Sequence, residues 1–503
     1  MRRAIPLTLI VASLFFGGMV AKAAAPANAG VASRAALVAQ IDAAIGQPRF
    51  AAARWGIAVV SLDHGDTLYA RNAGQLLQPA STAKLYTAAL SLAALGADYR
   101  IPTRLLATGP LSHGRLNSPL LLYGFGDPTL GTAGSAGWAD QLAAQAAARG
   151  LRVVRGDLIA DDSYFTGPAH GSGWELDDIL SAFAVPASAL SVGENVVRLT
   201  VSPAPRPGQP ARLQLDPAAA TPVAASRLLT AAAGTRNDIH FDRASGQDTL
   251  QAFGRIAADA PAQRFVLSVA DPARLAGRQL RDALKRHGIR ITGRVRVLHW
   301  PQGDAALMTS SELLGEVWSP PVGEILRRGL KRSQNLYLQN LLLTVGARER
   351  TATPGFSSAE SRGLNAMRQI LGAAGIAPST VLLSEGSGLS RRDLVTPEAL
   401  VRLLVYLAHQ PQAQVLRDAL PIAGVDGTLI HRMRGTAAED NVHAKTGSMS
   451  YVSSLAGYVT SASGEHLAFA IILNNYQRPP HAPPVSSDID AIAVLLANYR
   501  GAR

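Results

Sequence analysis

Cysteine is absent from this chain of 503 residues, which excludes disulfide bonds, a thiolate nucleophile, zinc–cysteine sites and iron–sulfur clusters. Aromatic residues make up only 5% of the sequence, so side chains on which bases or sugars could stack are scarce. Charged residues are also few, at 17% against 48% hydrophobic residues, a balance typical of globular proteins with buried cores. The length is enough for about two to four domains.

Acidic residues are outnumbered, because 48 Lys and Arg stand against 36 Asp and Glu for a net charge of +12. A basic surface suits anionic partners such as nucleic acid, a membrane surface or an acidic wall polymer. No run of five basic residues occurs and aromatic residues do not alternate with arginines, so no nucleic-acid binding is expected. Arginine keeps its proton in proteins and lysine can lose it, so each lysine is a candidate for proton transfer. Only five residues are lysine: Lys22, Lys84, Lys285, Lys331 and Lys445.

The first 25 residues resemble a secretory signal peptide. Arg2 and Arg3 precede an apolar run from Ala4 to about Val20, and small residues at a spacing read by signal peptidases follow. An uncleaved anchor helix is the alternative, although the run is slightly short to span a bilayer. We therefore expect export to the periplasm or another site outside the cytoplasm, in association with the cell envelope.

Patterns of apolar and turn-forming residues predict helices and strands in two separate parts of the chain, with a different region between them. Strands are expected at 55–61 and 67–70, followed by a helix over 82–95 that Gly96 closes. From about 97 to 305, short β-like segments alternate with loops rich in Pro, Gly and Ala, which predicts inserted β-rich units. Further predicted helices are 311–317, 322–330, 334–345, 398–409 and 488–499, and further strands are 452–459 and 466–473.

Three short motifs could carry chemistry. Ser81 and Lys84 form an S-x-x-K at the start of a predicted helix, where a spacing of three places both side chains on one face. A serine hydroxyl is a weak nucleophile until a neighbour takes its proton, and an amine can do so if burial or a nearby cation lowers its pKa. Ser333 and Asn335 form an S-x-N at another predicted helix start, where a helix cap is the simpler interpretation.

The third motif, Lys445-Thr446-Gly447 followed by Ser448, precedes a predicted strand and is the most specific of the three. Lysine offers a positive charge for a carboxylate, and the hydroxyls of Thr446 and Ser448 offer donors. A glycine on an edge strand lets the backbone of a ligand approach closely. The eleven histidines form no H-E-x-x-H and no pair with metal spacing, so we expect no metal and no cofactor.

The order S-x-x-K, S-x-N, K-T-G resembles that of the penicillin-recognising serine enzymes, the penicillin-binding proteins and serine β-lactamases. The 252 residues between Ser81 and Ser333 leave room for inserts that ordinary serine β-lactamases lack. The layout is similar to class C low-molecular-mass penicillin-binding proteins, the D-alanyl-D-alanine carboxypeptidase/endopeptidase family. Residues 124–130 (G-F-G-D-P-T-L), 188–190 with Asn195, and 385–391 (E-G-S-G-L-S-R) also match that family, with Glu385 in place of its usual Asp. The glycine-flanked Ser387 is interpreted as part of a structural turn near the cleft.

This resemblance implies a multi-domain α/β fold, in which an antiparallel sheet flanked by helices forms a transpeptidase-like catalytic domain. After the signal peptide at 1–25, the catalytic domain would comprise 30–96 and 306–503. A first β-rich insert would comprise 97–195 and 270–305, with a second nested within it at 196–269.

The resemblance also implies a serine D,D-peptidase in which Ser81 attacks the carbonyl between two terminal D-alanines and Lys84 takes the proton. Ser333 would relay a proton, and Asn335 would hold Lys84 and a substrate amide. The other implied substrate contacts are Lys445, Thr446, Gly447 and Ser448 for the terminal carboxylate and backbone, and Asp161 or Asp162 for a free side-chain amine.

The expected partners are peptidoglycan stem peptides as substrate and β-lactam antibiotics as inhibitors. The basic charge leaves open a peripheral association with membrane or murein, and the sequence predicts no oligomeric state. Two alternatives stay open: a serine β-lactamase or esterase on the same core, and a catalytically silent wall-binding protein.

Overall fold

The computed structural model describes residues 31–218, 222–244, 246–303, 305–349 and 355–501. The predicted signal peptide at 1–25 lies outside these residues. Within the described ranges, no helix has the length and apolar character needed to cross a membrane.

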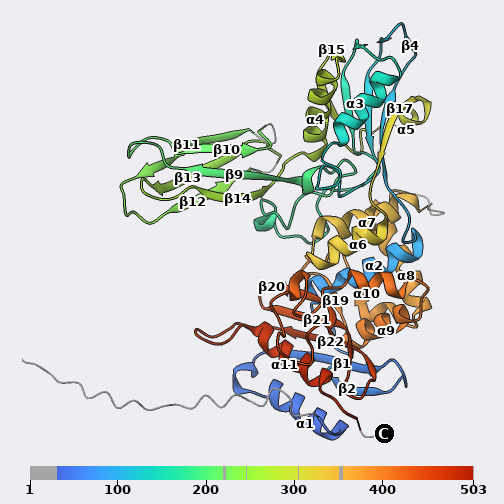
Figure 1. The fold of residues 1–503 in the computed structure, drawn as a ribbon, viewed down its shortest axis with the longest axis vertical. Coiled ribbons are helices and arrows are strands. Elements are labelled where there is room, and N and C mark those ends of the chain that lie inside the picture. The colour runs from blue at the N-terminus through green and yellow to red at the C-terminus, as the bar shows by residue number, and fades with distance from the viewer. Residues whose placement is uncertain (1–30, 219–221, 245, 304, 350–354, 502–503) are drawn as a thin grey trace, which may run out of the picture.

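The catalytic part is built on a five-stranded antiparallel sheet with the order β2-β1-β22-β21-β20 (Figure 1). Its middle strands are buried from both sides, which is why their sequences are almost continuously apolar, as in the run from Leu467 to Leu473. The strands are β1 (Arg54–Ser61), β2 (Thr67–Arg71), β20 (His443–Met449), β21 (Val452–Thr460) and β22 (His466–Asn474). The K-T-G motif lies on β20, at an edge of this sheet.

Helices cover both faces of the sheet. One face packs against α1 (Arg34–Ile45) and α11 (Val485–Ala497), with Leu37, Ile41 and Ile489 in the shared core. The other face meets a larger group in which α2 and α7 are buried on almost every side. The group comprises α2 (Lys84–Ala94), α6 (Val322–Lys331), α7 (Asn335–Arg348), α8 (Ala359–Ala373), α9 (Pro397–Ala408) and α10 (Ala413–Ala419). The S-x-x-K and S-x-N motifs lie at the starts of the two most buried helices.

The first insert is centred on a second five-stranded sheet with the order β16-β8-β6-β3-β17. Two helices, which the sequence analysis did not predict, pack together beside this sheet and share its apolar core. The strands are β3 (Pro102–Ala107), β6 (Leu120–Gly124), β8 (Leu158–Asp161), β16 (Val295–Leu298) and β17 (Glu312–Trp318). The helices are α3 (Trp138–Ala148) and α4 (Pro272–Arg286), and the short elements are β4 (Leu111–Ser112), β5 (Arg115–Leu116), β7 (Val153–Val154), β15 (Arg290–Ile291) and α5 (Ala305–Ser310).

The helix predicted over 311–317 is wrong, because this segment is strand β17 and pairs with β3. The spacing of Leu313, Leu314 and Val317 imitates one face of a helix, and only the tertiary pairing with β3 decides between the two. The predicted start of the second catalytic segment at 306 therefore falls before the last strand of the insert's own sheet.

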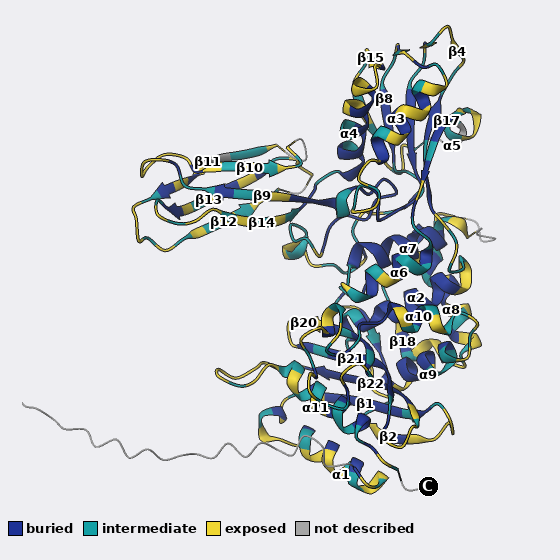
Figure 2. Cartoon of the chain, viewed as in Figure 1, coloured by how far each residue is buried: buried dark blue, intermediate teal, exposed yellow. Residues whose placement is uncertain are grey.

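The second insert is an arm made of two small three-stranded sheets, β10-β9-β14 and β11-β13-β12. It projects sideways from the rest of the chain, and its loops and outward faces are largely exposed (Figure 2). Its small core includes Leu199, Val201, Leu228 and Ile256. The strands are β9 (Val196–Ser202), β10 (Arg212–Asp216), β11 (Val223–Ala231), β12 (Asp238–Asp242), β13 (Leu250–Ala257) and β14 (Gln263–Ser268). The predicted mixed α/β architecture with an antiparallel sheet flanked by helices and two inserts is confirmed.

Candidate active site

Ser81 lies on a short 3₁₀ turn, Ala80–Ala83, that runs directly into α2. The Nζ atom of Lys84 donates a hydrogen bond of 2.8 Å to the Oγ atom of Ser81, as the spacing of three residues allows. Ala80 has a φ of +47°, a left-handed conformation that L-residues other than glycine rarely adopt. The chain therefore holds a strained residue next to the hydroxyl that it presents.

Lys84 is fully buried, yet all three of its hydrogen-bond partners are neutral. Besides Ser81, its Nζ atom donates to Asn335 Oδ1 at 2.6 Å and to the carbonyl oxygen of Ser387 at 2.7 Å. Burial lowers the pKa of Lys84 to about 7, against the opposing effect of the negative charges of Glu385 and Asp393. A neutral amine could keep its bonds to Asn335 and Ser387 and turn its lone pair to the hydroxyl of Ser81.

Ser333 connects α6 to α7 and has a left-handed φ of +55°. Its Oγ atom accepts a hydrogen bond of 2.9 Å from Lys445 Nζ, which also donates to the carbonyl oxygen of Thr446 at 2.7 Å. The helix-cap interpretation is wrong, because Gln334 is the cap residue of α7 and makes no capping bond. Burial, followed by the nearby charge of Lys84, lowers the pKa of Lys445 well below its ordinary value.

The K-T-G motif brings β20 against the turn that carries Ser81. A Cβ atom at Gly447 would lie 2.7 Å from the carbonyl oxygen of Pro79 and closer still to Ser454 Oγ. The expected reason for this glycine, access for a ligand, is therefore corrected: its bare face admits the chain's own backbone. The Thr446 hydroxyl bonds to Thr428 Oγ1 at 2.8 Å, and Ser448 is exposed.

The turn around Ser387 is organised by a buried carboxylate. Glu385 accepts hydrogen bonds from the backbone N–H groups of Ser387 at 2.7 Å, Gly388 at 2.5 Å and Leu389 at 3.0 Å. Gly388 has a φ of +78°, and a Cβ atom there would collide with the carbonyl oxygen of Ala80. The turn thus packs against the Ser81 segment and holds its Ser387 carbonyl toward Lys84, as the structural-turn interpretation expected.

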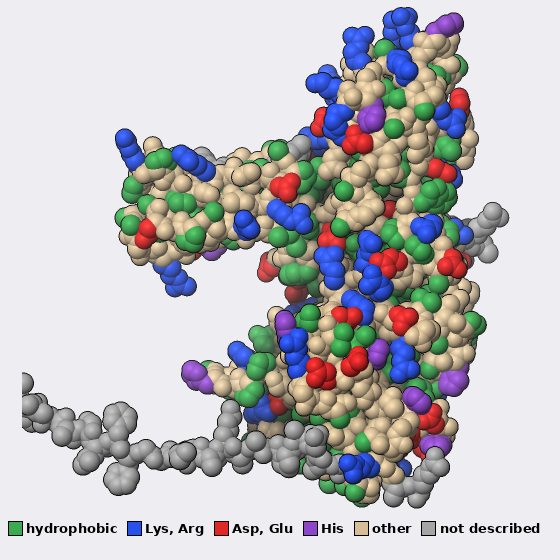
Figure 3. Space-filling model, viewed as in Figure 1, with side chains coloured by type: hydrophobic (Ala, Val, Ile, Leu, Met, Phe, Trp, Pro, Cys, Tyr) green, Lys and Arg blue, Asp and Glu red, His purple; other side chains and the backbone are tan. Residues whose placement is uncertain are grey.

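These groups border a cleft of about 350 Å³. Of the predicted residues, Ser81, Ser333, Asn335 and Ser448 line it directly. The other lining residues are not predicted from the sequence: Glu175, Asp178, Phe183, Gly388, Leu389, Arg391, Met449 and Ser450. Three of these come from the first insert, and the acidic run at 175–178 was the only signal in the sequence that could have drawn attention to them. Between the arm and the catalytic part, the face of the molecule is deeply hollowed (Figure 3).

Asp161 and Asp162 lie elsewhere. Asp161 is fully buried at the end of β8, where its Oδ1 atom accepts from the backbone N–H of Ser163. Asp162 accepts from Ser188 Oγ at 2.7 Å, is bonded to His299 Nδ1 at 2.8 Å, and lines a separate pocket. Neither carboxylate lines the cleft at Ser81, in contrast to the expected contact with a substrate amine.

Comparisons with known proteins agree over almost the whole chain. A profile of the D-Ala-D-Ala carboxypeptidase 3 (S13) family matches residues 37–499. The D-alanyl-D-alanine carboxypeptidase of Actinomadura sp. (strain R39) is 38% identical over 509 residues, which cover 99% of this chain and 89% of that protein. The D-alanyl-D-alanine carboxypeptidase DacB of Haemophilus influenzae is 28% identical over 408 residues, 80% of this chain and 82% of that protein. The crystal structure of penicillin binding protein 4 (dacB) from Haemophilus influenzae superposes with a TM-score of 0.78 at 26% identity, covering 92% of this chain and 98% of that one.

Proposed function

The chain belongs to the D-Ala-D-Ala carboxypeptidase 3 (S13) family, and from this membership we propose which residues perform its reaction. It is a serine-type D,D-peptidase that acts on the D-Ala-D-Ala bond of peptidoglycan stem peptides. The residue roles that follow, acylation by β-lactams and export are parts of the proposal.

Ser81 is the nucleophile and Lys84 is its general base. The neutral amine of Lys84 takes the hydroxyl proton while Ser81 Oγ forms a bond to the carbonyl carbon between the two D-alanines. The C–N bond then breaks, and the proton passes to the leaving amine of D-alanine through Ser333. Water hydrolyses the resulting acyl-enzyme and releases the shortened peptide. The observation that carries this proposal is the 2.8 Å bond between Lys84 Nζ and Ser81 Oγ at a buried amine with a pKa of about 7.

Lys445, Thr446 and Ser448 bind the terminal carboxylate, and Asn335 orients Lys84 and a substrate amide. Burial holds the pKa of Lys445 low in the free enzyme, and an incoming carboxylate raises it again, so the substrate helps to charge its own binding site. The backbone N–H groups of Ser81 and Ser448 stabilise the oxyanion, an interaction whose loss typically lowers rates by about 10² to 10³. A substrate backbone pairs along β20, which is an edge strand of the sheet.

A β-lactam would acylate Ser81 in the same first step and be released slowly in the second. The test is covalent labelling with a fluorescent penicillin. Wild type is expected to be labelled and Ser81→Ala is not. Ser450→Ala, which changes another serine of the same cleft, is expected to label like wild type. Labelling of Ser81→Ala at the wild-type rate would contradict the assignment of the nucleophile.

The substrate class is tested separately. We expect release of D-alanine from a stem pentapeptide to exceed turnover of a chromogenic cephalosporin by a wide margin. The reverse result would favour a β-lactamase. Export is tested by the mass of the protein recovered from the cell envelope, which is expected to lack a segment close to 1–25.

A further inference from the structure

The first insert contacts the catalytic part directly beside Ser333. We propose that Glu194 of the insert is a positioning residue for Ser333 and acts through Arg332. This inference rests on the proposed role of Ser333 in proton transfer. It gives the insert a part in the reaction, because a carboxylate outside the catalytic part would hold one of its reacting groups in place.

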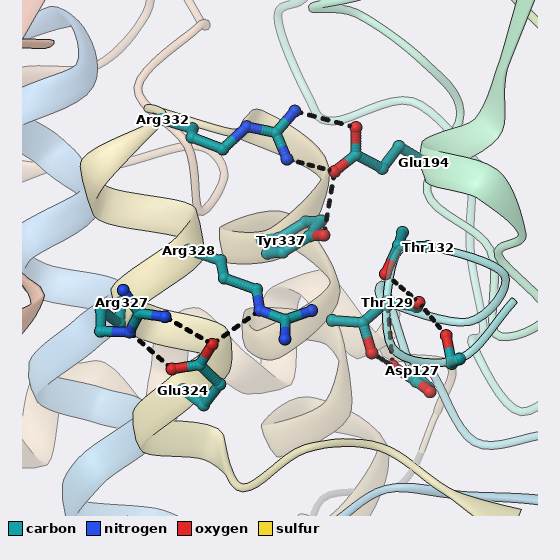
Figure 4. A network of polar contacts seen from close by, with 10 residues as sticks. Asp127, Thr129, Thr132, Glu194, Glu324, Arg327, Arg328, Arg332 and Tyr337 are labelled. Carbon is teal, nitrogen blue, oxygen red and sulfur yellow. Dashed lines mark hydrogen bonds and ion pairs between the residues drawn. The ribbon is translucent and has the colours of Figure 1, made fainter. Parts of the chain in front are cut away.

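The carboxylate of Glu194 is held from both sides of Ser333. Its Oε1 atom accepts from Arg332 Nη1 at 2.7 Å, and its Oε2 atom accepts from Arg332 Nη2 at 3.1 Å, in a two-point contact. The hydroxyl of Tyr337 donates to the same Oε1 atom at 3.0 Å. Figure 4 shows the carboxylate facing both partners. Arg332 precedes Ser333 and Tyr337 lies one turn into α7, so the contact spans the backbone that presents Ser333.

Burial makes this ion pair more than a solvated surface contact. The side chain of Glu194 is only 15% exposed, although that of Arg332 is 57% exposed. A carboxylate so withdrawn from water needs its hydrogen-bond partners, and removing one of them leaves it poorly satisfied. The guanidinium fixes direction as well as distance, because its two parallel N–H groups match the two carboxylate oxygens.

The backbone on both sides of the contact is strained. Glu194 has a φ of +60°, Asn195 one of +56° and Ser333 one of +55°. Left-handed conformations are strained for residues other than glycine and persist only where the surroundings hold them. Asn195 fixes the insert's turn by accepting from the N–H of Val192 at 2.8 Å and donating to the carbonyl oxygen of Pro186 at 2.8 Å. The turn thereby directs Glu194 toward the catalytic part.

Two further residues of α7, Asn335 at its start and Asn340 further along, also contact the insert. Asn340 donates to the carbonyl oxygens of Gly126 and Ser188, each at 3.1 Å. Asn335 donates to the carbonyl oxygen of Phe183 at 2.7 Å. The matching strings at 124–130 and 188–190 thus serve the contact with α7 and lie away from the Ser81 cleft. Of these contacts between the insert and the catalytic part, the one made by Glu194 reaches Arg332, the residue directly before Ser333.

A neighbouring ion pair provides a matched control. On α6, Glu324 accepts from Arg327 at 2.6 Å and 2.8 Å and from Arg328 at 2.8 Å, as Figure 4 shows. All three residues belong to the same helix, so Glu324→Gln removes a charge contact within α6 and no hydrogen bond to the insert. Glu324→Gln and Glu194→Gln are therefore the same chemical change at sites that differ in whether they join the two parts.

The experiment measures kcat and KM for D-alanine release, with active sites counted by penicillin titration so that unfolded protein is excluded. Glu194→Gln is expected to lower kcat about tenfold, since small displacements of reacting groups carry large rate penalties, and to leave KM within about twofold. Glu324→Gln is expected to keep both constants within about twofold. The double variant Glu194→Gln/Arg332→Gln should lose no more than the worse single variant, because the two residues act as one unit.

Arg332→Lys keeps the charge but not the two-point geometry, so its kcat should lie between those of wild type and Arg332→Gln. If Glu194→Gln yields too few titratable sites, the comparison of Arg332→Lys with Arg332→Gln replaces it. Additive losses, or a Glu194→Gln kcat equal to that of Glu324→Gln, would overturn the inference. Ser333→Ala distinguishes a failure of the proposed function of Ser333 from a failure of the role of Glu194. A wild-type kcat in Ser333→Ala would refute the proposed function of Ser333. A low kcat in Ser333→Ala with a normal one in Glu194→Gln would refute only the role of Glu194.

Discussion

Two groups of cations, one at the Ser81 cleft and one at the first insert, have opposite surroundings in this molecule. In the catalytic part, Lys84 and Lys445 are fully buried and bond to neutral oxygen atoms. Within the described ranges, neither amine has a carboxylate at ion-pair distance. At the insert, His299 bonds to Asp162 at 2.8 Å and lies 3.6 Å from Asp271, and the insert's Glu194 holds Arg332.

The two groups of cations differ in whether they can give up a proton near neutral pH. Burial without a paired carboxylate lowers the pKa of Lys84 to about 7, so its proton can be exchanged near neutral pH. The hydrogen bond to Asp162 and then the nearby carboxylate of Asp271 raise the pKa of His299 to about 10, so this ring stays charged near neutral pH. Burial therefore dominates the pKa of Lys84, whereas neighbouring carboxylates dominate the pKa of His299.

The largest effect is expected when Lys84 is replaced by a residue that keeps its proton. Lys84→Arg keeps a positive charge but cannot release its proton, so the rate of penicillin acylation is expected to fall about 10³-fold. Lys445→Arg retains a cation for the substrate carboxylate and should lose much less, about tenfold. The measurement is the second-order rate constant of acylation for each variant.

Lys285→Arg is the control for these two exchanges, because Lys285 is an exposed residue of α4 on the insert. It should acylate like wild type. An acylation rate constant for Lys84→Arg within tenfold of wild type would show that the amine need not be neutral. The low pKa of Lys84 would then have no role in acylation.

A second test displaces the edge strand β20 without changing any charge. Gly447→Ala places a methyl group 2.7 Å from the Pro79 carbonyl oxygen, which must displace β20 from the Ser81 turn. We expect acylation to fall about 10²-fold with a lower unfolding temperature. Gly372→Ala, at a helix position with no atom within 4 Å of the added methyl, should be neutral or stabilising by about 0.5–1 kcal/mol. Equal unfolding temperatures and rates in both variants would contradict the packing argument.

The smallest effect is expected for His299, the cation that is paired with carboxylates of the insert. His299 has a folded-state pKa of about 10 against an ordinary 6.5, so its stabilisation is complete below pH 6.5 and disappears as the pH rises through 10. His299→Gln should therefore lower the unfolding temperature at pH 6 and converge with wild type above pH 10. The half-exposed ring limits the effect to roughly 1 kcal/mol. A difference between the variants that grows with pH would refute the assigned pairing.

Much of the site could be predicted from sequence because three short motifs occur together in an order that resembles that of a known family. The structure brings the residues of these motifs together at one edge of the cleft: Ser81, Lys84, Ser333, Asn335 and Lys445. Burial of the two lysines could not be derived in this way. It arises from helices and strands far apart in the chain, and burial sets their pKa values.

The errors share a physical cause, which is tertiary context. The segment 312–318 has apolar spacing compatible with a helix, and its pairing with β3 makes it a strand. The sequence predicts that Asp161 or Asp162 meets a substrate amine, whereas Glu175 and Asp178 are the acidic residues that line the cleft. Which acidic residues of an insert face a distant cleft depends on how the insert is docked, and local sequence patterns contain no information on that.

The most direct test of the central claim is the pH dependence of the second-order rate constant for penicillin acylation by the free enzyme. If Lys84 is the base, the rate rises with pH along a limb with an apparent pKa near 7. Glu385→Gln should move that limb to lower pH, because the Glu385 charge raises the pKa of Lys84. A rate that is flat from about pH 5 to 9, or a limb near the ordinary lysine pKa of 10.5, would contradict the account.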